Sequence, residues 1–355
     1  MLWNREQKSL PDLIDDAVEA LKRADERAFG KAAQAVFKHA PKASPEELTA
    51  GLETLRPVLA TVPFGMGVTL AQLAAGLVEL GGDPLVAFET LVSRVSEGLE
   101  LACAFQETWD AEGHGELPDS DDGGKIPFVM QHLTSEESRQ RAEAWFTINE
   151  WIPSLLLPLQ QKVARKAVPH WERLTVAAGT TREVIGSSQW LYGLLQVLDD
   201  EKFVVLHRES RRGYELTIGG VGDVFQLHTL LAAHLIGDPA QGWIAGVPPR
   251  REWVIAATDG EDLQPGGIEG RFNLVDAYGR WIWNEDLPND IPRFDGVRVI
   301  VLDPPPYVRG WNLGRAYPLM YPAVTVDRHM SDQEAAAWLT KVAPAARWCA
   351  AGSVA

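Results

Sequence analysis

Residues 202–220 have the sequence KFVVLHRESRRGYELTIGG, and here the chain changes from helical to strand-like patterning. Two short apolar runs flank a polar segment, which predicts a β-hairpin with Ser210–Gly213 at its tip. Beyond it, FNLVDA, RWIWN, VRVIVL and WVIAAT are further candidate strands, and AVTV is a weaker one. Asp223 is placed to cap a helix over VFQLHTLLAAHLI, and the capping box Ser331–Glu334 predicts a last helix. Residues 201–355 are therefore expected to form an α/β domain that carries the candidate site.

The chain before this segment has helical patterning. Ser9 and the capping box Ser44–Glu47 predict helix starts, and Asp83-Pro84 predicts another, about one helical repeat further on. Residues 1–109 are thus expected to form a helical domain with a repeat-like character. Residues 110–124 are acidic and glycine-containing, which indicates a linker or loop, and 125–200 are expected to form a helical connecting region. The predicted class is mixed, α+β or α/β: an all-helical N-terminal half followed by a mixed-sheet C-terminal half with flanking helices.

Composition excludes several classes of protein. A 46% apolar and 23% charged chain of 355 residues is globular, and its net charge of −16 disfavours nucleic acid as a partner. The N-terminal residues carry charges where a signal peptide would be apolar, and no apolar run approaches the roughly 20 residues that span a bilayer. The two cysteines lie far apart in sequence and indicate no disulfide framework. These features predict a cytoplasmic protein without membrane contact, and the alanine-rich, lysine-poor composition suggests a bacterial source.

The segment 271–315 combines tryptophans with carboxamide, carboxylate and guanidinium groups beyond what packing requires. On a strand, Trp281 and Trp283 would share one face, with Ile282 and Asn284 on the other. One interpretation of these tryptophans is structural: they pack in the core. The other is functional: they line a ligand pocket in which arginines bind a carboxylate in bidentate fashion. Its predicted ligand-binding residues are Trp281, Trp283, Asn284, Arg309, Trp311, Asn312, Arg315 and His228.

One motif in this segment has a known counterpart. Asp303-Pro304-Pro305-Pro306-Tyr307 follows an apolar strand and resembles the DPPY loop of amino-methyltransferases. That resemblance implies that Asp303 holds a substrate amine and that the ring of Tyr307 stacks on a base. Upstream, Gly219, Gly220, Gly222 and Asp223 resemble the glycine-rich turn that seats S-adenosylmethionine in such enzymes.

The chain departs from the methyltransferase pattern by an extra proline after Asp303 and by Phe225 where the last glycine of GxGxxG would stand. The alternative interpretation of both motifs is structural. Gly219–Gly222 would then be a tight strand-to-helix turn, and the triple proline would be a rigid turn leaving a strand.

Other candidate sites are weaker. His228 and His234 are six residues apart on a helix, which places them on different faces and disfavours a shared metal ion. The acidic segment 110–122 lacks the ligand spacing of a calcium-binding loop. No P-loop, HExxH, GxSxG, CxxC or kinase signature occurs in the sequence.

The sequence therefore predicts a binding protein for a small molecule or another protein, with its pocket in 271–315. The alternative is an enzyme, a methyltransferase-like transferase with S-adenosylmethionine as cofactor. Under the binding hypothesis, Asp303→Ala should cost only about 1 kcal/mol of local turn stability. Under the enzyme hypothesis, the same change should abolish activity. The ligand, the oligomeric state and the pathway stay open.

Overall fold

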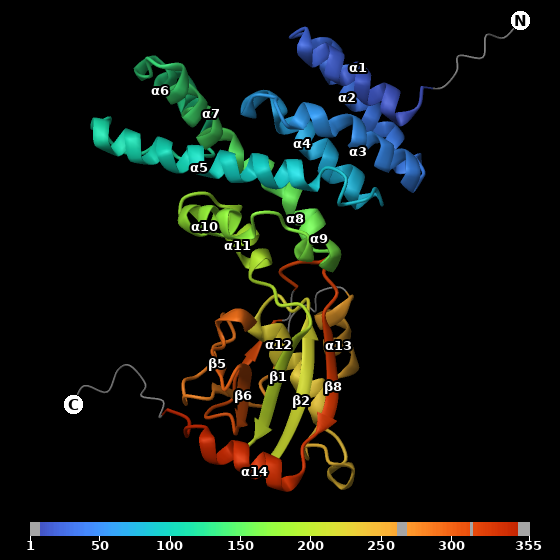
Figure 1. Cartoon of the computed structure of the whole chain (residues 1–355), viewed down its shortest axis with the longest axis vertical. Helices are drawn as coiled ribbons and strands as arrows, with labels where there is room; N and C mark the ends of the chain where they lie inside the picture. The colour runs from blue at the N-terminus through green and yellow to red at the C-terminus, as the bar shows by residue number, and fades with distance from the viewer. Residues whose placement is uncertain (1–7, 261–267, 313–314, 347–355) are drawn as a thin grey trace, which may run out of the picture. The chain divides into compact units, whose positions relative to one another are not determined.

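The computed structural model describes residues 8–260, 268–312 and 315–346, so Cys349 lies outside the described residues. The chain divides into two units, Met1–Leu195 and Gln196–Ala355 (Figure 1). The first is helical and the second contains a mixed sheet with flanking helices, which confirms the predicted class. The proposed boundaries within the helical region and its repeat-like character stay predictions.

The first unit is built from helices of very different length. They are α1 (Leu10–Lys22), α2 (Glu26–His39), α3 (Pro45–Leu59), α4 (Phe64–Glu79), α5 (Phe88–Glu112), α6 (Ile126–His132), α7 (Glu136–Trp151), α8 (Pro153–Leu159), α9 (Lys162–Lys166), α10 (Trp171–Thr181) and α11 (Ser188–Leu195).

Helix starts in this unit follow the predicted capping residues in two cases and miss them in one. Ser9 and Ser44 form capping boxes, as predicted. Asp83, however, begins a turn in which its side chain accepts from the Leu85 N–H at 2.9 Å, and α5 starts only at Phe88. Because an aspartate side chain can stabilise a turn as readily as a helix start, the sequence did not separate the two.

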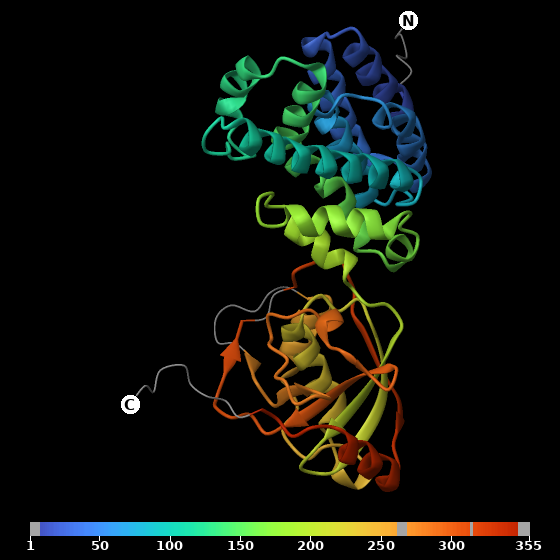
Figure 2. The same cartoon turned by 60° about the vertical axis from the view of Figure 1, so that its left-hand side comes forward.

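Helices α4, α5 and α7 pack together around buried aromatic rings (Figures 1 and 2). Trp151 is fully buried, and its indole N–H donates to the Phe64 carbonyl at 2.9 Å. Gly67 of α4 lets this ring approach the helix backbone, since a Cβ there would lie 2.3 Å from the Trp151 ring.

Gly67→Ala is therefore expected to destabilise the first unit by about 1–3 kcal/mol through overpacking. Gly76→Ala on the same helix is the matched control, because a Cβ there meets nothing within 4 Å. The control should be neutral or stabilising by roughly 0.5–1 kcal/mol. Urea unfolding followed by far-ultraviolet circular dichroism measures both, and equal effects of the two substitutions would contradict the packing argument.

The second unit is built on one sheet with strand order β4-β6-β1-β2-β8. β1 and β6 pair in parallel, whereas the other pairs are antiparallel, and β5 also pairs with β6. β3 and β7 form a separate two-stranded sheet. The elements are β1 (Glu201–His207), β2 (Arg212–Gly219), α12 (Val224–Leu235), α13 (Arg251–Thr258), β3 (Ile268–Glu269), β4 (Asn273–Asp276), β5 (Arg293–Phe294), β6 (Val297–Asp303), β7 (Gly310–Trp311), β8 (Ala323–His329) and α14 (Asp332–Lys341).

Alternate residues of the central strands face two separate cores. Phe203 and Val205 of β1 pack with residues of α12 and α13, and Val204 and Leu206 pack on the other face with α14. The same period-two division holds for β6. Figure 1 shows α12 and α13 behind the sheet and α14 across its lower end. Both faces are covered, which explains why β1 and β6 are nearly continuous apolar runs.

Three local predictions in this unit are wrong. WVIAAT is helix α13, because Trp253, Ala256 and Ala257 are buried at helical spacing, and a short apolar run does not distinguish strand from helix. RWIWN forms only one bridge, between Val275 and Trp281. The hairpin turn covers residues 208–211, since His207 pairs with Arg212, so its tip lies about two residues earlier than predicted.

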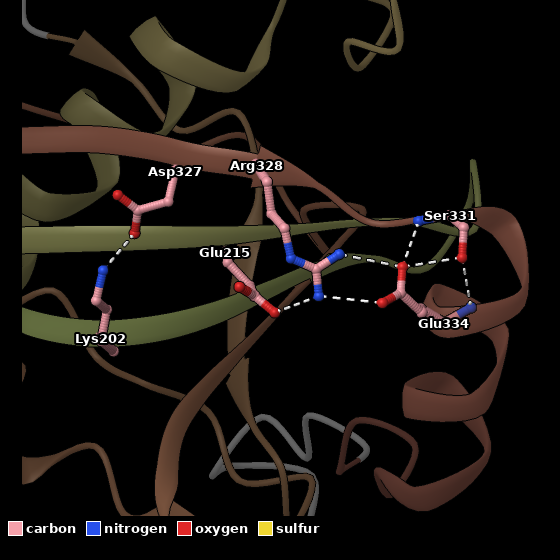
Figure 3. A network of polar contacts seen from close by, with 6 residues as sticks. All are labelled: Lys202, Glu215, Asp327, Arg328, Ser331 and Glu334. Carbon is pink, nitrogen blue, oxygen red and sulfur yellow. Dashed lines mark hydrogen bonds and ion pairs between the residues drawn. The ribbon is translucent and has the colours of Figure 1, made fainter.

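An exposed polar network joins α14 to the sheet (Figure 3). The Arg328 guanidinium of β8 lies 2.6 Å from a Glu215 carboxylate oxygen and 3.1 Å from Glu334. Glu334 also accepts hydrogen bonds from the backbone and hydroxyl of Ser331. Arg328 and Ser331 together lower the pKa of Glu334 to about 2. The charges lie on the edge strand β8, where they disfavour pairing with another chain.

Candidate functional site

Residues 273–276 of this segment form the edge strand β4, and the tryptophans of the segment divide between the two faces of the sheet. Trp281 packs on the α14 side, and its ring lies 5.5 Å from that of Trp283. Ile282 joins the core on the α12 side, and Asn284 is buried. The predicted period-two division is therefore present although no regular strand forms.

The chain leaves the sheet after Trp281 because the residues that follow bind the start of α12. The first amides of α12 lack partners within the helix, as at any helix start. Here the Val224 N–H donates to the Asp286 carbonyl and the Phe225 N–H to the Asn284 carbonyl, both at 3.1 Å. The Asp223 side chain accepts from the Gln226 N–H at 2.7 Å, which confirms the predicted cap. Residues 284–286 thus bind the helix start instead of continuing a strand.

His228 organises the α12 side of the segment. It is 1% exposed, and its Nε2 accepts hydrogen bonds from the Arg271 and Phe272 N–H groups at 3.1 and 3.2 Å. Its ring centroid lies 5.0 Å from that of Trp311. His228, Trp311 and Asn284 are thus brought to the same side of the sheet, with their side chains largely buried.

The surroundings of His228 keep its ring neutral. Burial and, to a smaller extent, the positive charge of Arg309 lower the pKa of His228 to about 3, while a hydrogen bond with Asn284 has the opposite effect. Because Nε2 accepts two N–H groups, the single ring proton lies on Nδ1. His228 therefore acts as a neutral acceptor that holds the backbone leading into β4.

The predicted arginines do not present their guanidinium groups to a ligand. Arg309 donates to the Phe272 carbonyl at 2.8 Å. Arg315 donates to the carbonyls of Thr258 and Gly260 at 2.7 and 3.0 Å. These bonds join separate segments of backbone, so the expected bidentate recognition of a carboxylate finds no support here. Asn312 is exposed, next to residues outside the described part of the chain.

The two methyltransferase-like motifs lie at opposite ends of the strands. Asp303 ends β6, which runs parallel to β1, whereas Gly219 ends β2, which runs antiparallel to β1. The length of β1, seven residues, separates these two ends of the sheet by about 20 Å at the usual rise per residue. Gly219, Gly220 and Gly222 therefore cannot place a cofactor beside Asp303.

Each motif has a structural role that accounts for its residues. Gly220 has φ +66° and lies where a Cβ would be 2.7 Å from the Tyr321 carbonyl oxygen, so this turn needs glycine. Asp303 is buried and accepts from Arg208 Nε at 2.7 Å. Arg208 also donates to the Ala343 carbonyl at 2.9 Å. Tyr307 is exposed in the loop that follows.

A cavity of about 180 Å³ lies at the β4 edge and contains part of the predicted site. Trp281 lines it, together with three carboxylates that share this opening. The lining residues are Asp276, Arg280, Trp281, Ile282, Asp286, Asp290, Ile291 and Pro292.

The aspartates of this cavity are held by backbone N–H groups. Asp276 accepts from the N–H groups of Tyr278 and Arg280 at 2.8 and 3.0 Å, and its other oxygen accepts from Arg280 Nε at 2.8 Å. Asp286 accepts from the Trp283 N–H at 2.9 Å, and Asp290 from the Leu287 N–H at 3.0 Å. These bonds fix the carboxylates in place before any ligand arrives.

Of the residues that line this cavity, only Trp281 was a predicted site residue, so sequence reasoning missed Asp276, Arg280, Asp286 and Asp290. A signal was present for Arg280, because Asp276 to Arg280 spans a tight turn with Gly279 at φ +85°. An aspartate before such a turn can reach the amides and the side chain that follow it. Asp286 is placed by the departure of the chain toward α12, which local sequence does not reveal.

The described residues offer neither a metal centre nor a membrane-spanning helix. Within the described residues, no three histidine, cysteine, aspartate or glutamate side chains gather in a way that could hold a metal ion. None of the helices in that part of the chain has the length and apolar character needed to cross a membrane.

The chain was compared with family models, curated proteins and solved structures. None of the three comparisons found a match.

Proposed function

We propose that the second unit binds a partner protein and that the cavity beside β4 receives a basic side chain of that partner. The observation that carries the proposal is the cavity itself, where Asp276, Asp286 and Asp290 gather beside the Trp281 ring. Carboxylates in fixed positions recognise guanidinium and ammonium groups through charge-assisted hydrogen bonds. An aromatic wall adds attraction for the same cations.

The cavity volume favours one side chain over a whole metabolite. At about 180 Å³ it is below the roughly 300–1,000 Å³ typical of pockets that enclose small-molecule ligands. It equals the volume of about six water molecules at roughly 30 Å³ each. An arginine or lysine head group with part of its aliphatic stem fits such a space, while the rest of the ligand must lie outside.

Exposed aromatic residues beside the cavity support an interface. Trp283 is 45% exposed next to Trp281, and Tyr278 is 54% exposed on the turn that carries Arg280. Tryptophan, tyrosine and arginine are the residues most enriched among those that dominate binding energy at protein interfaces. The overall charge of −16 would also accelerate association with a basic partner.

The charge balance within the cavity is negative. Arg280 is paired with Asp276 at 2.8 Å, and 67% of its side chain is exposed. The hydrogen bonds of Asp286 and Asp290 come from backbone amides, which do not neutralise a carboxylate charge. Asp286 has no side-chain counterion among these contacts, whereas Arg298 lies close enough to Asp290 to interact with its charge. An incoming cation would therefore find its least compensated partner at Asp286.

Binding of n-propylguanidinium to the full chain tests the proposal, with neutral n-propylurea as its isosteric control. Nuclear magnetic resonance should show saturable shifts of the Trp281 and Trp283 indole N–H signals with the cation only. Asp286→Asn and Asp290→Asn should each weaken binding by about fivefold to tenfold, since each removes one nearby charge. Both substitutions keep an oxygen that can accept the backbone N–H.

Glu285→Gln is the matched control, because it removes one exposed charge from the residue next to Asp286, outside the cavity lining. It should leave the affinity nearly unchanged. Equal shifts with n-propylurea, or equal weakening by Glu285→Gln, would show that the cavity does not select a cation.

The geometry does not favour the methyltransferase alternative, because its two motifs lie at opposite ends of the strands and Asp303 already accepts a hydrogen bond from Arg208.

A further inference from the structure

A second cavity, of about 520 Å³, lies within the helical unit and is independent of the site proposed above. It is bordered by the end of α5, the acidic segment after it, α6, α7 and the residues between α10 and α11. Most of its lining is apolar or aromatic. The lining residues are Trp109, Glu116, Leu117, Pro118, Asp119, Ser120, Lys125, Phe128, Trp145 and Val184.

Two buried tryptophans hold one wall of this cavity in place. The Trp109 indole N–H donates to the Glu116 carbonyl at 3.3 Å, and the Trp145 indole N–H donates to the Pro118 carbonyl at 3.0 Å. Both rings also pack against Phe105. The backbone of residues 116–118 is therefore fixed next to the rings, and the wall is formed before a ligand binds.

Aspartate turns fix the rest of the acidic segment. Asp119 accepts from the Asp121 N–H at 2.9 Å, and Asp122 accepts from the Gly124 N–H at 3.1 Å. Asp121 in turn accepts from the Asn149 side chain of α7 at 2.7 Å. A pre-organised wall lowers the entropy that a ligand must overcome on binding.

The charged residues at the rim of the cavity favour ligands with a positive charge. Glu116 and Asp119 are exposed at the opening, against one cation, Lys125. Further carboxylates follow along the same segment, at Asp110, Glu112, Asp121 and Asp122. A cleft lined mainly by one sign of charge raises the local concentration of ligands of the opposite sign.

We infer that this cavity binds a small organic cation with an aromatic body, of the arylalkylamine class. Its volume lies in the range of pockets that enclose small molecules. The ring system would contact Phe128, which is 50% exposed, and the half-buried Leu117 and Val184. The ammonium group would lie at the rim, beside Glu116 and Asp119.

Calorimetric titration of the full chain with three probes tests this inference. Tryptamine carries the cation, tryptophol is its neutral analogue and indole-3-acetate is an anionic one. Tryptamine should bind about tenfold more tightly than tryptophol, and indole-3-acetate should bind most weakly. Glu116→Gln with Asp119→Asn should remove most of the preference for tryptamine and leave tryptophol binding unchanged, since only the charged probe responds to these carboxylates.

A cavity-filling variant locates the binding. Val184→Trp should weaken both tryptamine and tryptophol at least about tenfold. Val176→Trp is the matched control, because Val176 is 64% exposed on α10 and does not line the cavity.

Tryptamine binding that survives Val184→Trp but is lost in Asp286→Asn would place the probe in the second unit and overturn the inference. Equal binding of tryptamine and indole-3-acetate would also overturn it. The Glu116 and Asp119 variants alter exposed side chains and decide the question if Val184→Trp does not fold.

Discussion

Acidification below pH 6.5 is expected to destabilise the second unit through His228. The pKa of this histidine is about 3 in the folded chain, against a reference value of 6.5. Between these values the unfolded chain binds a proton that the folded chain does not. The free energy of unfolding should therefore be fully retained above pH 6.5 and should fall by up to about 1.4 kcal/mol per pH unit below it. The total loss at pH 3 would be on the order of 5 kcal/mol.

The cause is the set of contacts around the ring. Protonation at Nε2 would end its acceptance from the Arg271 and Phe272 N–H groups and would place a second positive charge near Arg309. Loss of these bonds would free the chain that enters β4. We therefore expect opening to be detected first in residues 268–276 and in α12.

Hydrogen exchange measured by mass spectrometry between pH 4 and 7, corrected for the intrinsic exchange rate, follows this opening. His228→Gln keeps a neutral acceptor and should flatten the pH dependence, although the variant starts less stable than the parent. His234→Gln, on the same helix, is the control. His234 is exposed on the surface of this helix, and desolvation alone lowers its pKa. An unchanged pH profile in His228→Gln would assign the acid sensitivity to other groups.

Asp303→Ala is expected to cost about 2–3 kcal/mol of stability, well above the value of about 1 kcal/mol that the sequence suggested for a simple turn. Asp303 is nearly buried and pairs with Arg208 at 2.7 Å, so its removal leaves a guanidinium without its counterion. Arg208 is about one-third exposed, and water will screen part of this cost.

A double-mutant cycle with Arg208→Ala separates the pair from the packing. The two single substitutions should be non-additive, because each removes the same interaction. Asp295→Asn provides the control: its ion pair with Lys341 is half exposed on both sides, and asparagine keeps the tolerance for the φ of +50° at this position, so loss of the pair should cost no more than about 0.5 kcal/mol. Denaturant unfolding of all four chains and the control gives the coupling energy. Strict additivity of the two single substitutions would contradict the structural role assigned to Asp303.

Sequence patterns predicted this fold best where one local interaction decides an element. The capping boxes at Ser9, Ser44 and Ser331 each start a helix, because side-chain oxygens there satisfy amides that the helix leaves free. The apolar runs of β1 and β6 became central strands. WVIAAT failed because its six residues fit a buried strand or a buried helix equally well, and only contacts with α12 select the helix.

The candidate site was predicted only in part, because some of its contacts depend on residues that are distant in the sequence. The shared face of Trp281 and Trp283 follows from backbone geometry alone. The roles of Arg309 and Arg315 depend on which distant carbonyl groups the fold brings to them, and one sequence does not contain that information. The two methyltransferase-like motifs were placed together by analogy, whereas the direction of β2 puts them at opposite ends of the strands.

The pairing of β1 with β6 also has a consequence for synthesis of the chain. In their register Phe203 lies opposite Arg298, which is 95 residues later in the sequence. The β1–β2 hairpin leaves the ribosome long before β6, and only α12 and α13 can cover one of its apolar faces meanwhile. Because such non-local pairing folds slowly and leaves strand edges open, the nascent second unit should be most prone to aggregate until β6, β8 and α14 have all emerged, that is, up to residue 341.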